Sequence, residues 1–192
     1  DATPDFREQL ARVAADAPAC TLAGVFLTHA HMGHYTGLMH LGREAMGASH
    51  VPVWGMPRMR EYLTTNGPWS QLVRLGNIEL RSLAADSSVT LGDSLSVTPF
   101  VVPHRDEYSE TVGFRITGPR AEVVFVPDID KWERWDRRIE DVIANARVAY
   151  LDSVSTGDPE LRARLEELLV ACERGERLLL TPAESFAPLL TV

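Results

Sequence analysis

The stretch LTHAHMGHYTGL, Leu27 to Leu38, decides the fold because it places three histidines within six residues, directly after an apolar run. The run Val25–Leu27 is rich in β-branched and aromatic residues, which predicts a buried strand that breaks into a loop. His29 and His31 lie two residues apart, so they point the same way in an extended chain, and His34 follows where a helix can begin. Three imidazoles around one point suit zinc, iron or manganese, with one position open for water. The alternative is that single histidines of this cluster only hydrogen-bond the loop.

The segment His29–His34, HAHMGH, resembles the H-x-H-x-D-H signature of the metallo-β-lactamase fold, a superfamily of metal-dependent hydrolases and some oxidoreductases. Gly33 stands where dinuclear members carry an aspartate that binds the second metal. The stretches VVPHRDEYSETVGFRI from Val101 and VVFVPDIDKW from Val123 resemble two later ligand stretches of the same fold. Together with NGPWSQLVRLGNIEL from Asn66, the pattern is most similar to the branch around the pyrroloquinoline-quinone biosynthesis protein B, whose members are mostly of unproven activity.

The resemblance covers roughly residues 1–152 and implies an α/β fold, the αββα sandwich. In it, two mixed sheets pack face to face with helices outside and a metal at the strand ends. We expect residues 1–192 to be a single such domain, lacking part of its N-terminal sheet and its last ligand strand, and the sequence informs less after Ser153. The family ends in a histidine that completes the second metal site, whereas no histidine follows His104. The resemblance therefore implies one tightly bound metal, unless Glu184 or another carboxylate substitutes or further residues lie outside the chain.

Two more ligand candidates stand at strand ends. His104 follows the apolar run Leu95–Val102, where it is well placed to complete a three-histidine site with His29 and His31. Asp128 follows the run Ala121–Val126, and a carboxylate at the end of a buried strand has to be hydrogen-bonded, ion-paired or metal-bound. In the resemblance, Asp128 matches the aspartate that reaches both metals. The predicted metal ligands are His29, His31, His34, His104 and Asp128.

Catalytic and substrate contacts are predicted on loops, where binding residues collect over a rigid scaffold. Asp128 and Asp106 are the catalytic candidates, and Asp106 with Glu107 either orients an imidazole and handles protons or forms only a solvated turn. Asn66 and Trp69 are candidates to contact substrate, although packing of the tryptophan against the scaffold explains it equally well.

Composition bounds the class of protein. A chain of 192 residues with 45% hydrophobic content is long enough for one globular core. The net charge of −8 argues against a nucleic-acid surface, which requires clustered Lys and Arg. No apolar run approaches the ~18 residues of a membrane span, and no signal peptide is evident, so we expect a cytoplasmic protein without membrane contact. The chain opens on Asp1 without an initiator Met. We therefore expect a preceding segment that would carry any targeting signal.

Periodicity predicts the remaining elements. Helices are expected over Phe6–Ala15, His34–Met46, Pro57–Leu63, Lys131–Ala146 and Asp158–Cys172. The segment Thr64–Arg74 is expected to be a loop. Strands are expected over Val51–Trp54, Ile78–Leu83, Val89–Leu91, Leu95–Val102, Thr111–Thr117, Ala121–Val126, Val148–Leu151 and Arg177–Leu180, with the three that begin at Ile78, Val89 and Leu95 antiparallel. Asp130 is expected to cap the helix that begins at Lys131, and Asp152 to stand near the site.

The function predicted from these features is hydrolysis of a small-molecule ester, phosphodiester or lactone-like bond by a metal-activated water. Zinc is the expected metal, with iron or manganese as alternatives. Two other functions fit the same residues: an iron-dependent oxidoreductase of the cofactor-biosynthesis type, and a metal-binding module without catalysis.

Overall fold

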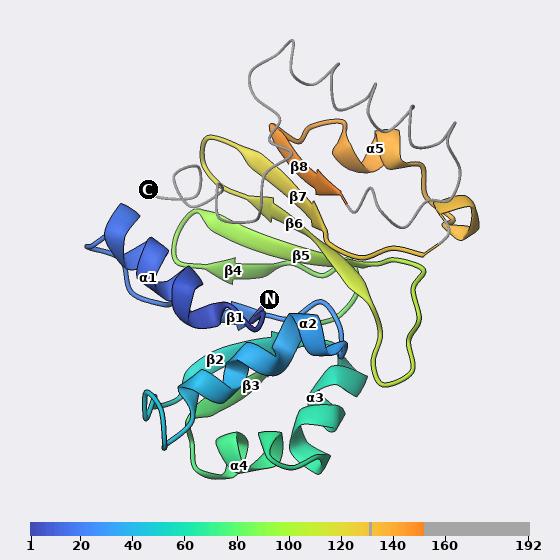
Figure 1. Ribbon diagram of the computed structural model, residues 1–192. Helices are drawn as coiled ribbons and strands as arrows, with labels where there is room; N and C mark the ends of the chain where they lie inside the picture. The colour runs from blue at the N-terminus through green and yellow to red at the C-terminus, as the bar shows by residue number, and fades with distance from the viewer. Residues whose placement is uncertain (131, 152–192) are drawn as a thin grey trace. The chain divides into compact units, whose positions relative to one another are not determined.

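The computed structural model describes residues 1–130 and 132–151, which fall into two compact units (Figure 1). The first unit comprises Asp1–Ala85 and the loop Asp106–Glu110, and the second contains Asp86–Arg105 and the chain from Thr111 onward. The loop Asp106–Glu110 therefore belongs to the first unit although the chain on both sides of it belongs to the second.

The first unit is built on a parallel three-stranded sheet in the order β1-β2-β3. Its strands are β1 (Val25–Phe26), β2 (Val51–Gly55) and β3 (Ile78–Ser82), and its helices are α1 (Phe6–Asp16), α2 (Met32–Tyr35), the 3₁₀ helix η1 (Thr36–Leu41), α3 (Pro57–Thr65) and α4 (Trp69–Arg74). Pro57 opens α3, where its missing N–H is not needed. Met59 and Leu63 lie four residues apart on α3, so both enter the core and both are almost fully buried.

The second unit contains a five-stranded sheet in the order β4-β5-β6-β7-β8, antiparallel except for the parallel pair β7 and β8. Its elements are β4 (Val89–Leu91), β5 (Leu95–Val101), β6 (Val112–Thr117), β7 (Glu122–Val126), the 3₁₀ helix η2 (Trp132–Arg134), α5 (Ile139–Ile143) and β8 (Val148–Leu151). Phe100 on β5 pairs with Gly113 on β6, and a Cβ at Gly113 would collide with the Phe100 ring. Glycine is thus required where this aromatic ring crosses the neighbouring strand.

Most predicted strands and the helices from Phe6 and Pro57 are confirmed, but β3 is parallel to β2 rather than antiparallel. The reason lies in the connection: α3 and α4 separate β2 from β3, and a crossover of that length joins parallel strands. The predicted loop Thr64–Arg74 was therefore wrong, because its second half forms α4.

Two predicted helices are shorter than expected. The helix expected over His34–Met46 ends at Leu41 as a 3₁₀ helix, since the Gly37 N–H donates to Ala2 O and Gly42 is extended, with φ −63° and ψ 163°. The helix expected over Lys131–Ala146 is split into η2 and α5, because Arg138 is extended between them. Asp130 Oδ1 lies 3.3 Å from His104 Nδ1, and the capping role of Asp130 stays a prediction.

Asp152, the helix Asp158–Cys172, the strand Arg177–Leu180 and Glu184 lie outside the described residues. Within residues 1–130 and 132–151, every helix is too short or too polar to cross a bilayer.

Candidate metal centre

The histidine loop follows β1 in the first unit. The Leu27 N–H donates to Trp54 O on β2 (3.0 Å), which fixes the end of the strand. His31 itself has extended dihedral angles, with φ −91° and ψ 144°, and α2 begins at the next residue. As the spacing predicted, the His29 and His31 rings approach each other, with centroids 4.5 Å apart.

A hydrogen-bond chain sets the protonation of His29. Asp1 accepts hydrogen bonds from the Thr28 N–H (2.8 Å) and from the Thr28 hydroxyl (2.9 Å to Oδ2). Because the single hydrogen of that hydroxyl is donated to the carboxylate, the hydroxyl oxygen accepts a hydrogen bond from His29 Nδ1–H, 3.0 Å away. The lone pair of His29 is thereby assigned to Nε2, and the ring is 1% exposed.

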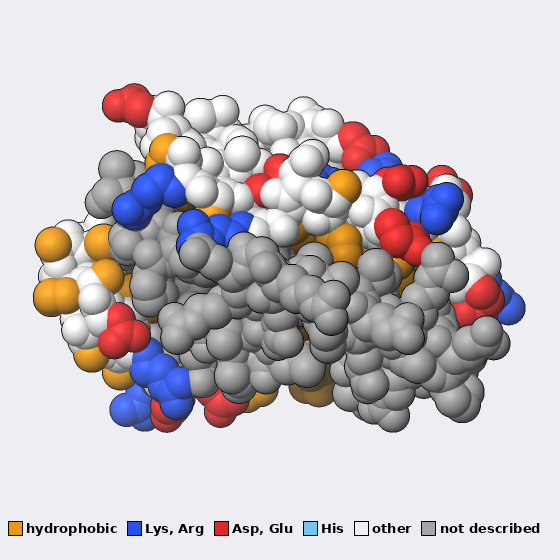
Figure 2. All heavy atoms as spheres, turned by 90° about the horizontal axis from the view of Figure 1, so that it is seen from above, with side chains coloured by type: hydrophobic (Ala, Val, Ile, Leu, Met, Phe, Trp, Pro, Cys, Tyr) orange, Lys and Arg blue, Asp and Glu red, His pale blue; other side chains and the backbone are white. Residues whose placement is uncertain are grey.

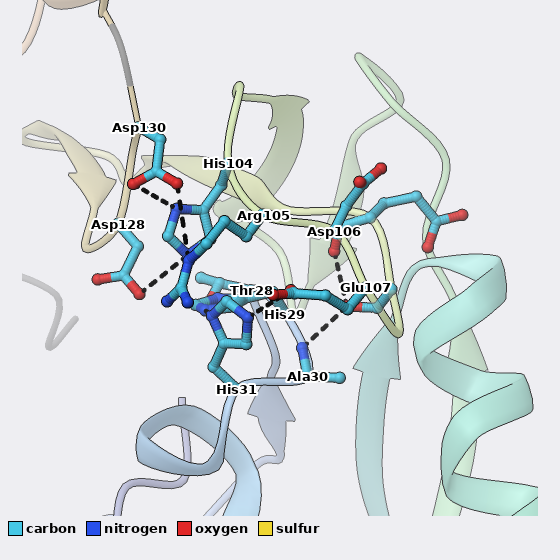
Figure 3. Close-up of polar contacts among 12 residues, drawn as sticks. Thr28, His29, Ala30, His31, His104, Arg105, Asp106, Glu107, Asp128 and Asp130 are labelled. Atoms are coloured by element: carbon cyan, nitrogen blue, oxygen red, sulfur yellow. Dashed lines mark hydrogen bonds and ion pairs between the residues drawn. The ribbon is translucent and has the colours of Figure 1, made fainter.

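His31 is oriented from its other side. Its Nε2–H donates to Glu107 Oε2 at 2.8 Å, which assigns its lone pair to Nδ1. Glu107 is half-exposed and lies in the loop Asp106–Glu110 (Figure 3). A carboxylate bound to the far nitrogen of an imidazole is the partner that usually orients a metal-ligating histidine.

The two assigned lone pairs converge on one point. His29 Nε2 and His31 Nδ1 lie 2.9 Å apart, and two lone pairs at this distance repel unless a proton or a cation lies between them. Two nitrogens that bind one zinc at about 2.05 Å with a tetrahedral angle lie about 3.4 Å apart. If the two rings move slightly apart, a metal ion therefore fits between His29 Nε2 and His31 Nδ1.

His34 is placed differently from the other two histidines of the motif. Its Nδ1–H donates to Asp1 Oδ2 at 2.9 Å, and its ring lies beside that of His29, with centroids 4.2 Å apart. His34 can therefore offer a metal only its Nε2. Asp1, whose side chain is 5% exposed, thus binds both Thr28 and His34 of the histidine motif.

The second unit carries the other two predicted ligands at strand ends. His104 follows β5 and Asp128 follows β7, and His104 Nε2 lies 3.6 Å from Asp128 Oδ2. That distance is too long for a hydrogen bond but close to the separation of two ligands on one metal. On the other side of the ring, Asp130 Oδ1 lies 3.3 Å from His104 Nδ1 (Figure 3). Each unit therefore presents one pair of donor atoms at a spacing that suits a metal.

The remaining predicted residues lie in the first unit. Asp106 is 67% exposed and faces Arg58, so Glu107 rather than Asp106 contacts an imidazole. Trp69 is buried at the start of α4, with its ring 5.0 Å from that of Tyr35. This environment agrees with the alternative that the tryptophan packs against the scaffold. Asn66 is exposed and its side-chain amide donates to Tyr62 O. Substrate contact by Asn66 and Trp69 stays a prediction.

Two residues of this region gave no signal in the sequence. Asp1 stands 27 residues before Thr28, and Ser109, which is buried, accepts a hydrogen bond from the Ala30 N–H at 2.8 Å. Neither belongs to a ligand spacing, so only the folded chain reveals them.

Comparison with known proteins bears on the family and the fold. The family described as Beta-lactamase superfamily domain matches residues 1–184, while no curated protein matches the sequence. The fold is similar to Zn(2+)-bound PqqB from Methylobacterium extorquens, at 20% identity and a TM-score of 0.62, over 79% of this chain and 54% of PqqB. The chain thus spans about half the length of that relative.

Two further solved structures share the fold. Unliganded yeast PDE1 is 15% identical with a TM-score of 0.53, over 87% of this chain and 60% of PDE1. MEM-A1, a subclass B3 metallo-β-lactamase isolated from a soil metagenome library, is 19% identical with a TM-score of 0.50, over 89% of this chain and 74% of MEM-A1. At these identities the likeness concerns the fold alone, whereas the family match spans nearly the whole sequence. The chain belongs to the beta-lactamase superfamily and has the metallo-β-lactamase fold.

Proposed function

We propose that this protein is a metal-dependent hydrolase that cleaves a small-molecule ester, phosphodiester or lactone-like bond. The proposed ligands are His29 Nε2, His31 Nδ1, His104 Nε2 and Asp128 Oδ2. The observation that carries the proposal is the convergence of two imidazole lone pairs, those of His29 Nε2 and His31 Nδ1. Hydrogen bonds to Thr28 and to Glu107 keep the proton of each ring on its other nitrogen. Three imidazoles and one carboxylate suit zinc first, and iron or manganese next.

Covalent connection supports joining the two ligand pairs in one site. The loop Asp106–Glu110 is hydrogen-bonded inside the first unit, where Ser109 contacts Ala30 between the two histidines. His104 precedes Asp106 by two residues, and two residues of chain span at most about 7 Å. In sequence, His104 stands only three positions before Glu107, the partner of His31.

A bound divalent metal of this kind lowers the pKa of a coordinated water to about 7 and polarises the bond to be cleaved. The chain's own groups orient the ligands: Thr28 and Asp1 hold His29, Glu107 holds His31, and Asp130 faces His104. Glu107 is 49% exposed, so it is also placed to exchange protons with solvent.

Exposed apolar side chains next to the His31–Glu107 pair suit an apolar part of a small substrate. Met32 and Tyr108, each next in sequence to one member of the His31–Glu107 pair, are 72% and 60% exposed. On the face drawn in Figure 2, both acidic and basic side chains are seen among the described atoms. Together with the net charge of −8, this supports a small-molecule substrate over a nucleic acid.

The test is to remove metal with a chelator, reload separate samples with zinc, manganese or iron(II), and assay ester, phosphodiester and lactone panels. We expect zinc to restore hydrolysis of at least one class in the wild type and in His50→Ala, but not in His104→Ala. His50 is an exposed histidine outside the proposed ligands and serves as the matched control. Turnover with iron alone, accompanied by oxygen consumption, would indicate an oxidoreductase. Tight metal without any turnover would indicate a non-catalytic module.

A further inference from the structure

The loop Asp106–Glu110 is anchored to the first unit at several points. Ser109 accepts from the Ala30 N–H, Glu110 accepts from the Arg58 N–H at 3.1 Å, and the Tyr108 ring lies 5.5 Å from that of Tyr62. These contacts hold residues that are remote in sequence, since Arg58 and the loop are about fifty positions apart.

Arg58 makes most of the anchoring hydrogen bonds. Its Nη2 donates to Asp106 O at 2.8 Å and to Glu107 O at 3.3 Å, and its Nη1 donates to Asp106 Oδ2 at 3.4 Å. Its backbone N–H, at the first turn of α3, donates to the Glu110 carboxylate. One residue thus fastens both ends of the loop to a helix of the first unit. The planar fork of a guanidinium suits two neighbouring carbonyl oxygens, which the single ammonium of lysine cannot replace.

The fastened loop continues directly into a proposed metal ligand. Only Arg105 separates Asp106 from His104, so a displacement of Asp106 is transmitted to His104 within two residues. The same loop also carries Glu107, which accepts a hydrogen bond from His31. If the loop were not anchored, His104 would therefore be misplaced and His31 would lose its hydrogen bond to Glu107.

We propose that Arg58 is a positioning residue for the metal centre, because it clamps the loop Asp106–Glu110 and through it holds His104 and Glu107 in place. The inference rests on the proposed function, since it requires that His104 be a ligand together with His29 and His31. Arg58 itself touches neither metal nor substrate in this account.

Electrostatics and positioning predict opposite effects of removing Arg58. A nearby positive charge repels a bound cation, so loss of the guanidinium by itself would tighten metal binding. Loss of the clamp would weaken it, and partners one layer outside the ligands typically change metal affinity by 10–100-fold. For a clamp that is 44% exposed we expect the lower end of that range, about tenfold.

The experiment measures zinc affinity by chelator competition, and the visible spectrum of the Co²⁺-loaded protein, for wild type, Arg58→Gln, Arg58→Lys and Arg81→Gln. Arg81 is the matched control, an exposed arginine of β3 whose side chain pairs with Glu79. We expect about tenfold weaker zinc and an altered Co²⁺ spectrum for both Arg58 variants, and no change for Arg81→Gln. Trypsin should also cleave faster after the exposed Arg105 in the Arg58 variants, a readout that requires no metal.

Each outcome distinguishes the clamp from the proposed function. A wild-type chain that binds no metal would overturn the proposed function and, with it, the role of Arg58. A wild type that binds zinc, with Arg58 variants that bind it equally or more tightly, would overturn the role of Arg58 alone. If Arg58→Gln fails to fold, Ser109→Ala removes the anchor at Ala30 instead, and unchanged zinc affinity in that variant would equally contradict the clamp.

Discussion

At the scale of single residues, the account depends on which ring nitrogen of each histidine carries its proton. Thr28 determines this for His29, because its hydroxyl donates to Asp1 and accepts from His29 Nδ1–H. Thr28→Val should weaken zinc affinity by roughly 10–100-fold, and Thr28→Ser, which keeps the hydroxyl, should restore most of it. Chelator competition measures both. Equal affinity in the valine and serine variants would show that the hydroxyl does not matter.

His104 is the ligand whose assignment depends most on the strand-end argument. His104→Ala removes a donor atom altogether, so zinc affinity should fall by more than the roughly 10–100-fold typical of outer partners. His50→Ala should bind as the wild type does, since His50 is exposed, its ring contacts Ser49 and its backbone N–H donates to Gly76 O. Full-strength binding in the His104 variant would remove this residue from the ligand set.

Gly33 tests why a second metal is not expected. It lies in α2 without a positive φ, and a Cβ added there meets no atom within 4 Å, so aspartate is sterically acceptable at this position. Gly33→Asp supplies a carboxylate next to His34, and metal content should rise from about one toward two per chain. Elemental analysis of the folded variant checks this. An unchanged metal content would mean that the chain is built for one metal. It would also mean that a carboxylate at position 33 is not sufficient to create a second metal site.

At the scale of elements, one ion pair holds the segment before β4 to the segment before α5. Arg137 donates two hydrogen bonds to Asp86, at 2.9 and 2.6 Å, and these bonds lower the pKa of Asp86. The folded-state pKa lies below the unfolded value of about 3.9, so the pair stabilises the protein above that pH, and the stabilisation is lost as pH falls through the lowered pKa. Both side chains are more than a third exposed, so the contribution is at most about 1 kcal/mol.

Arg137→Gln should therefore lower the free energy of unfolding slightly at pH 7, and the difference from wild type should shrink as the solution is acidified below about pH 4. Urea unfolding at the two pH values measures it. A difference that stays the same in acid would assign the effect to packing of the Arg137 stem and not to the ion pair.

Local pattern predicted most elements of this fold and failed where contacts remote in sequence decide. The strand before the histidines and the strands that carry His104 and Asp128 follow from apolar runs. The short η1 does not, because the Gly37 N–H is diverted to Ala2. The helix α4 was missed because Asn66-Gly67-Pro68 indicates a turn, whereas the helix resumes directly after it.

At the scale of the whole molecule, the sequence could name the candidate ligands but not the residues that hold them. His29, His31, His104 and Asp128 stand in motifs or at strand ends, where residue type and spacing are informative. Asp1, Ser109 and Arg58 act through partners 27 to 79 positions away, and no local pattern encodes such pairs. The family match supplies the fold, while these contacts supply the reason why the imidazoles are fixed in orientation.

The central claim is that one chain holds one metal ion through the proposed histidine and aspartate ligands, and elemental analysis tests it most directly. The full chain is purified without added metal, and metal identity and moles of metal per mole of chain are measured. The account predicts about one tightly held zinc per chain in the wild type and none in His104→Ala, a count set by the number of ligands. A folded wild type without metal, or a His104→Ala variant that retains the full amount, would contradict it.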